Sequence, residues 1–156
     1  PSLQTLEIGP LAYALFVPSK LAPPRKPGTT AQWTKLLSRL PQARLVEGSQ
    51  LRRKVDEAHQ ASLIRPQIIA ESTSLLQLAA IVRAGQAAAI LPITAKCAFL
   101  GTETKTIALN GFLEYHRNLA LAFSLPNIRR RALEERQIKS LAQAITRTHS
   151  QRVNAR

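Results

Sequence analysis

Residues 68–94, IIAESTSLLQLAAIVRAGQAAAILPIT, decide the fold that we predict for this chain. The apolar run at residues 68–70 is typical of a buried strand, and a polar turn at residues 71–74 ends it. Apolar side chains then recur at helical spacing up to Gly85, a residue type that commonly ends a helix. A second short apolar run ends at Pro92. A strand, a helix and a strand of these lengths predict a βαβ unit, whose strands are parallel.

Three hydroxyl side chains lie just before this helix. Ser74, with Gln77 three residues later, fits a capping box, and Ser72 and Thr73 are competing cap positions. The unpaired N–H groups at a helix start favour a bound anion, and a hydroxyl group adds a hydrogen-bond donor. We therefore keep two compatible interpretations: the hydroxyl groups cap the helix, or they also contact a ligand.

The same strand–turn–helix pattern occurs once more, earlier in the chain. Residues 43–46 predict a strand, a turn with Gly48 and Ser49 follows it, and residues 50–61 predict a helix that Ser49 caps. The buried stripe that we expect on this helix consists of Leu51, Val55 and Ala58. Because the carboxyl ends of parallel strands meet at one edge of a sheet, both turns should face the same side.

Further elements flank these two repeats. The other predicted strands are residues 11–17, 106–109 and 118–125, the last with a helical alternative and a break at Pro126. Thr30 should cap a short helix around Trp33. Residues 19–30 are rich in proline and glycine and predict a loop or linker. Residues 132–148 predict an amphipathic helix whose inward face is Leu133, Ile138, Leu141, Ala144 and Ile145.

The composition argues against several classes of protein. No apolar run approaches the about 20 residues that cross a bilayer, and the first residues do not resemble a signal peptide. Cys97 is the only cysteine, so an internal disulfide is impossible, and its simplest role is that of a small buried hydrophobic residue.

Catalytic and metal-binding motifs are also missing. His59, His116 and His149 are isolated and have none of the close spacings of zinc ligands, so we predict no metal and no other cofactor. No Ser-His-Asp, Cys-His or paired-carboxylate arrangement and no glycine-rich phosphate loop stands out. The chain is therefore not predicted to be an enzyme.

The net charge of +13 suggests a polyanion or an anionic ligand as a partner. The basic residues are spread over separate clusters, such as residues 25–26, 52–54 and 129–131, rather than along one motif. No helix-turn-helix, zinc-finger or RNA-binding sheet pattern accompanies them. A solvated surface is the simplest interpretation of each cluster by itself.

Three stretches resemble the effector-binding domain of LysR-type transcriptional regulators. LFVPSKLA (15–22) is similar to the family's strand that ends in proline before a basic residue and Leu-Ala. STSLLQLAAIVRAGQAAAILPITA (72–95) resembles the family's helix that ends Val-x-x-Gly before a strand ending in proline. NLALAFSL (118–125) and the final helix resemble the closing strand and helix. The family's Gly-x-Gly is absent, because Gln86 and Ala87 follow Gly85.

This resemblance implies an α/β, two-lobe, type 2 periplasmic-binding-protein-like fold. Lobe one would consist of residues 1–18 and 117–150, and lobe two of residues 28–110. The crossings would be residues 19–27 and 111–116, and residues 151–156 would form a tail. The family's N-terminal winged helix-turn-helix and the opening strand and helix of lobe one have no counterpart here. We therefore expect a fragment whose first lobe is incomplete.

The resemblance also implies an effector site between the lobes. Thr73 lies twelve residues before Gly85, where some family members place a hydroxyl group that contacts the effector. Ser72 and Ser74 flank it, and Pro92 would line the same cleft from lobe two. The second repeat of the pattern would add Gly48, Ser49 and Gln50.

Arg52 is a further predicted effector contact. A positive charge in the first turn of a helix opposes the helix dipole, at a cost of roughly 0.3–1 kcal/mol when it is exposed. A bound anion would reverse that sign, which favours an acidic effector such as a carboxylate. The alternative, which we prefer for Arg52 and Arg53, is that solvated arginines are tolerated at this position.

The function that the resemblance implies is effector sensing in a cytoplasmic, homodimeric or homotetrameric regulator. A small metabolite would bind between the lobes, and promoter DNA would be contacted only through the DNA-binding domain absent from this sequence. The main alternative is a solute-binding protein of the same fold that feeds a transporter. An enzyme on a related two-lobe fold is the third possibility, because fold alone does not fix function.

Overall fold

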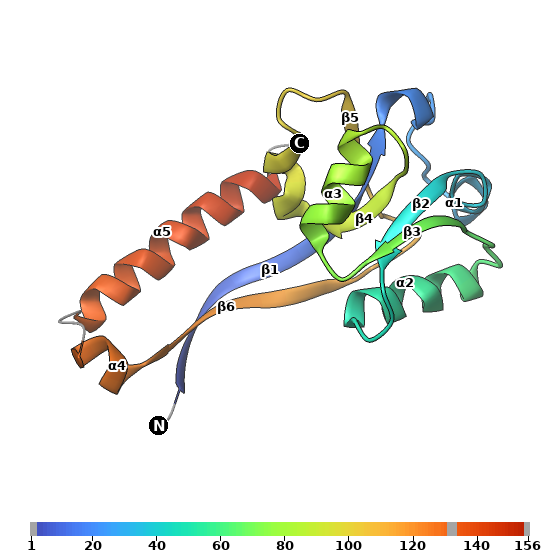
Figure 1. Cartoon of the computed structure of the whole chain (residues 1–156). Helices are drawn as coiled ribbons and strands as arrows, with labels where there is room; N and C mark the ends of the chain where they lie inside the picture. Colours follow the sequence, from blue (N-terminus) through green and yellow to red (C-terminus); the bar gives the residue numbers. More distant parts are fainter. Residues whose placement is uncertain (1–2, 131–133, 155–156) are drawn as a thin grey trace. The chain divides into compact units, whose positions relative to one another are not determined.

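The computed structural model describes residues 3–130 and 134–154, and of these it leaves the side chains of residues 128–130 and 149–154 undescribed (Figure 1). Its helices are η1 (Ser19–Leu21), α1 (Thr30–Leu37), α2 (Gln50–Ala61), α3 (Leu75–Arg83), η2 (Ile93–Phe99), α4 (Leu125–Arg130) and α5 (Glu135–Asn154). Its strands are β1 (Leu3–Pro18), β2 (Pro41–Leu45), β3 (Gln67–Ser72), β4 (Ala89–Pro92), β5 (Thr104–Ala108) and β6 (His116–Ser124). Two compact units result, one of residues 1–12 and 116–156 and one of residues 13–115.

The larger unit, residues 13–115, is built around the second half of β1. This half pairs antiparallel with β4 on one side and with β5 on the other. A parallel bridge between Gln42 and Ala88 joins β4 to β2, and β2 pairs parallel with β3. The two strands of the predicted βαβ unit, β3 and β4, therefore run in the same direction, but β2 lies between them.

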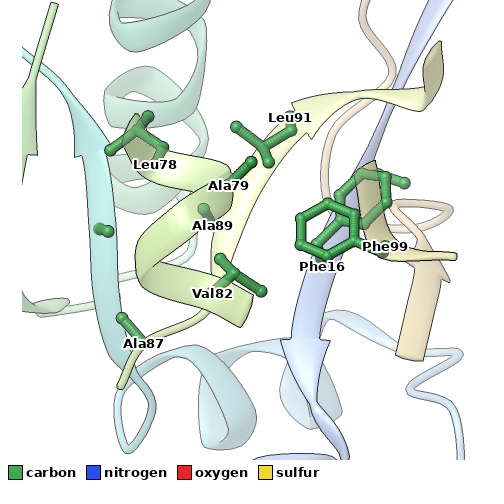
Figure 2. Close-up of a cluster of buried hydrophobic side chains, with 10 residues drawn as sticks. Phe16, Leu78, Ala79, Val82, Ala87, Ala89, Leu91 and Phe99 are labelled. Carbon is green, nitrogen blue, oxygen red and sulfur yellow. The ribbon is translucent and has the colours of Figure 1, made fainter. Parts of the chain in front are cut away.

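Two apolar clusters cover the two faces of β1. Ala14 and Phe16 belong to the cluster under α3, whereas Leu15 and Val17 belong to the cluster under α1, because successive side chains of a strand point to opposite faces. Figure 2 shows the first cluster, with Phe16 beside Phe99 and the buried face of α3 next to β4. The rings of Phe16 and Phe99 stack with their centroids 4.8 Å apart.

The predicted helix ends are largely confirmed. Ser49 and Ser74 are the N-caps of α2 and α3, and α2 spans the predicted residues. Gly85 ends α3 with a φ of 73°, and the N–H groups of Gly85 and Gln86 donate to the carbonyls of Val82 and Ile81, as in a Schellman motif. The cap of α1 was predicted one residue too late: Thr29, not Thr30, forms a capping box with Gln32.

The buried face of α2 differs from the predicted stripe. Leu51 and Val55 are buried as expected, but Ala58 is only half-buried. Two polar residues, Arg52 and His59, are buried on the same helix. The apolar pattern did not indicate them, because neither residue type is counted as apolar.

The smaller unit, residues 1–12 and 116–156, contains longer elements than predicted. The first half of β1 pairs antiparallel with β6, from Leu3 opposite Ser124 to Ala12 opposite His116. We had predicted this strand only from residue 11. Residues 118–124 of the predicted 118–125 belong to a strand and not to the alternative helix. Leu125 begins α4, and Pro126 lies inside that helix, where we expected a break.

The final helix also departs from its predicted bounds and inward face. It continues to Asn154 instead of ending near Thr148. Among its described side chains, Ala142 is buried, Ile138 and Ile145 are half-buried, and Leu141 and Ala144 are exposed. The predicted start at residue 132 and the predicted contact of Leu133 lie outside the described residues. The bounds of the two predicted lobes stay a prediction.

Candidate functional site

The two serine-bearing turns lie at one edge of the larger unit. Leu45 at the end of β2 is the register partner of Ser72 at the end of β3, and the N–H group of Val46 donates to the carbonyl of Ser72 at 3.0 Å. Because the strands are parallel, both turns leave the sheet at the same edge, as predicted. The parallel bridge to β4 places the carboxyl end of that strand, Pro92, at this edge as well.

The turn before α3 is held together by Ser72. The hydroxyl oxygen of this buried residue accepts a hydrogen bond from the N–H group of Ser74 at 2.9 Å. It also contacts the side chain of Gln77, so Gln77 does not complete the capping box that we predicted. Ser74 is the cap itself and accepts from the N–H group of Gln77 at 3.4 Å.

Thr73 stands apart from these contacts. Its side chain is exposed, and its hydroxyl group takes part in none of the hydrogen bonds that the structure gives for the described residues. The first N–H groups of a helix have no acceptor within the helix. Those of Leu75 and Leu76 are therefore directed to this turn, and both leucine side chains are exposed, by 38% and 79%. The turn thus offers hydrogen-bond donors beside apolar side chains.

The turn before α2 has more internal contacts. Gly48 has a φ of 97°, and the hydroxyl oxygen of Ser49 accepts from the N–H group of Arg52 at 3.0 Å. The amide oxygen of Gln50 accepts from the hydroxyl group of Tyr115 at 3.2 Å. Tyr115 stacks on Tyr13, with ring centroids 5.2 Å apart. Sequence reasoning missed both tyrosines, because neither forms part of a local motif.

A surface groove of about 620 Å³ lies along α2. It brings together four of the predicted site residues, Gly48, Ser49, Gln50 and Arg52. The residues of the other turn, Ser72, Thr73 and Ser74, and Pro92 do not line it. Pro92 is buried at the end of β4. The predicted site residues therefore share an edge of the sheet but divide into two groups.

Arg52 is not the solvated arginine that we preferred from the sequence. Its side chain is only 8% exposed, and it lies beside three acceptors. Nη1 donates to the carbonyl of Leu45 at 2.8 Å and to Glu71 at 3.1 Å, and Nε donates to Asp56 at 2.5 Å. The guanidinium group thus ties the end of β2 to the end of β3.

Arg44 completes this ion network. Its Nε donates to Glu71 at 2.8 Å, and its Nη1 lies 3.5 Å from Asp56. The hydrogen bond from Arg44, and then that from Arg52, lowers the pKa of Glu71. Two arginines and two carboxylates balance one another, so Arg52 carries no uncompensated charge toward a ligand. The i, i+4 spacing of Arg52 and Asp56 was visible in the sequence, but the contact with Glu71 depends on strand register.

The described residues show no group of metal ligands. Among the side chains that the structure describes, within residues 3–127 and 134–148, no three of His, Cys, Asp or Glu are grouped as metal ligands would be. Cys97, predicted to be buried, is exposed in η2, where its Sγ donates to the carbonyl of Thr94 at 3.1 Å. None of the helices in the described part of the chain is long and apolar enough to cross a membrane.

Comparison with known families and structures gives a consistent result. The family model of the LysR substrate binding domain matches residues 1–148. The effector binding domain of QuiR in complex with shikimate is 15% identical, with a TM-score of 0.58, over 96% of this chain and 68% of that domain. A protein from Vibrio parahaemolyticus that is described as a transcriptional regulator on assignment only is 11% identical, with a TM-score of 0.64, over 98% of this chain and 68% of that chain. No curated protein matches the chain.

A full-length regulator is also similar. CbnR, in complex with its target DNA, is 16% identical, with a TM-score of 0.55, over 95% of this chain but only 48% of CbnR. The chain therefore spans about half the length of that regulator. These matches confirm the predicted α/β, type 2 periplasmic-binding-protein-like fold.

Proposed function

Because the chain belongs to the LysR substrate-binding domain family, we propose that it is the effector-sensing part of a bacterial LysR-type transcriptional regulator, without catalysis of its own. The complete regulator would act in the cytoplasm as a homodimer or homotetramer and contact promoter DNA through another domain. The similar structures support this proposal, since one is described as an effector-binding domain with shikimate and another as a regulator with its target DNA.

The turn at Ser72–Ser74 carries the proposal for the site. Thr73 is exposed at the start of α3 and makes none of the internal hydrogen bonds that hold its neighbours. A carboxylate placed there would accept from the Thr73 hydroxyl group and from the N–H groups of the first helical turn. We therefore propose a small polar metabolite, with a carboxylate as the first class to test. Leu75 and Leu76 would contact its apolar part.

The other predicted residues have a different place in the proposal. Gly48, Ser49 and Gln50 would form the neighbouring wall at the end of β2, and Pro92 would support it from the end of β4. Arg52 would hold the ends of β2 and β3 in place without contacting the effector, because its charge is balanced by Asp56 and Glu71. The preference for a carboxylate thus rests on the helix start and not on Arg52.

A calorimetric titration tests this site. Shikimate and a panel of small carboxylates are titrated into the chain, and binding is expected to weaken at least tenfold in Thr73→Val, about 1.4 kcal/mol, because a hydrogen bond to a charged group is lost. Thr5→Val is the matched control, since Thr5 is exposed on β1 in the other unit. Equal affinity of both variants for a carboxylate that binds the wild type would remove Thr73 from the site.

The alternative, a solute-binding protein that feeds a transporter, has only the shared fold in its favour. The affinity of a complete regulator for promoter DNA distinguishes effector sensing from this alternative. A carboxylate that binds this chain should change the affinity of the complete regulator for promoter DNA, because binding and DNA contact are then coupled. An unchanged DNA affinity at saturating carboxylate would contradict effector sensing, even if the carboxylate binds.

A further inference from the structure

His59, in the last turn of α2, is a buried polar residue that the proposed function does not use. Its side chain is 4% exposed, and neither ring nitrogen has a hydrogen-bond partner in the structure. A neutral imidazole has one donor and one acceptor nitrogen, and leaving both unpaired in the interior costs free energy. Buried polar groups in proteins almost always have a partner, either protein or ordered water.

A small cavity adjoins this ring. It lies between α2 and β2 and is lined by His59, Val55, Arg52, Gln42, Arg44 and Ile90. The volume that the centre of a water molecule can occupy there is about 20 Å³. This space admits a water molecule and is too small for a metabolite.

The cavity walls also supply polar partners. Gln42 is buried, and its Nε2 donates to the carbonyl of Leu37 at 2.8 Å, which leaves its amide oxygen as an acceptor. Arg44 and Arg52 line the cavity too, but their charges are balanced by Asp56 and Glu71. The cavity should therefore bind a neutral molecule that can both donate and accept hydrogen bonds, rather than an anion.

We propose that this cavity is a binding site for one ordered water molecule, held by a ring nitrogen of His59 and by polar groups of β2. The water satisfies a group that would otherwise be unpaired, and it links the last turn of α2 to β2. Phe112 packs against the imidazole, with ring centroids 5.5 Å apart, which further fixes the ring. The neutral form of His59 is consistent with this site, because burial lowers its pKa to about 4.

A high-resolution crystal structure of the wild-type chain tests the proposal. It should show a water peak about 2.7–3.2 Å from a ring nitrogen of His59, in every copy of the chain. His59→Phe should lose the peak, and the matched control His116→Phe should keep it, because His116 is exposed at the start of β6. A wild-type structure without the peak would overturn the proposal, and so would a peak that persists in His59→Phe.

Two further measurements keep the test decisive. After a bromide soak, an anomalous peak in the cavity would show an anion site and overturn the water assignment. If His59→Phe does not fold, NMR on the wild type replaces it. A cross-peak between water and the ring protons of His59 is the expected result, and its absence would count against the site. None of these outcomes depends on whether the chain binds an effector.

Discussion

The repeats β2–turn–α2 and β3–turn–α3 share one plan but bury different side chains. Each has a serine N-cap after a parallel strand, and the two turns leave the sheet at the same edge. α3 buries only apolar residues among those described, Leu78, Ala79 and Val82. α2 buries Arg52 and His59 as well as Leu51 and Val55.

We propose that this difference reflects two roles: the first repeat supports the edge of the sheet, and the second repeat binds the effector. In the first repeat, the Nε and Nη1 groups of Arg52 donate to the ends of both strands and to its own helix, so these donors are used inside the protein. In the second repeat, the apolar helix is held by packing, and Thr73 is left exposed at its start. We infer that the first repeat fixes the edge on which the second repeat presents its hydrogen-bond donors.

The largest expected effect follows from breaking the ion network. Arg52→Gln should lower the free energy of unfolding by about 3 kcal/mol, the lower end for a broken buried ion pair, because Asp56 and Glu71 are partly exposed and keep Arg44. Arg53→Gln is the matched control. Arg53 is 66% exposed and lies 3.7 Å from Glu57, so its loss should cost under about 0.5 kcal/mol. Urea denaturation measures both, and equal losses would contradict the comparison.

The second effect is a dependence of stability on pH between about pH 6.5 and pH 5, which we expect from His59 in the first repeat. Burial lowers the pKa of His59 to about 4, Asp56 opposes this shift, and Arg44 and Arg52 add to it. An unfolded histidine has a pKa of about 6.5. The unfolded chain therefore binds the proton of His59 more tightly than the folded chain does. The contribution of neutral His59 to the free energy of unfolding is fully present above about pH 6.5 and is lost as the pH falls toward 4.

This loss should amount to about 2 kcal/mol between pH 6.5 and pH 5, from about 1.4 kcal/mol per pH unit. Unfolding free energies at pH 7, 6 and 5 measure it. His59→Phe should remove the dependence in this window, whereas His116→Phe should keep it, because His116 is exposed. A pH dependence that survives in His59→Phe would assign the titration to another group.

Local signals account for the elements that the sequence predicted well. The bounds of α2 and the caps of both repeats follow from Ser49 and Ser74, because a cap acts on its own first turn. The fold class followed from the βαβ pattern and the family resemblance. The position of β2 between β3 and β4 could not be predicted, because it depends on pairing between distant segments.

The same limit explains the errors. The first half of β1 contains Gln4, Glu7 and Pro10 and shows no apolar run, and it is a strand because it pairs with β6. Arg52 was predicted as an effector contact or a solvated residue. Its partner Glu71 could not be foreseen, because the register of β3 against β2 brings the two side chains together. Cys97 is exposed because it lies in η2, which the sequence did not indicate.

The third effect is the loss of stability when the glycine with positive φ in each repeat is replaced by alanine. Gly85→Ala should cost about 1–2 kcal/mol, because alanine is strained at a φ of 73°. Gly48→Ala, at a φ of 97°, should cost a similar amount. An added Cβ at Gly85 would also lie 3.0 Å from Cε of Lys20, whereas it would meet nothing at Gly48.

The end of Lys20 can move aside, so the strain should lie in the backbone. Gly85→Asn should therefore cost less than Gly85→Ala, since asparagine adopts positive φ more readily. The double variant Lys20→Ala, Gly85→Ala should recover less than about 0.5 kcal/mol. Thermal unfolding measures these differences. A full recovery in the double variant would show that contact with Lys20, and not φ, sets the cost.

The smallest effect concerns the serines of the two turns. Ser49→Ala removes one cap bond of 3.0 Å and should cost about 1 kcal/mol. Ser74→Ala removes a longer one, 3.4 Å, and should cost about half as much. Ser72→Ala should cost about 1 kcal/mol although Ser72 is not a cap, because its buried hydroxyl group holds both Ser74 and Gln77. If Ser74→Ala instead costs more than Ser72→Ala in urea denaturation, the second turn is organised by its cap, as the first is.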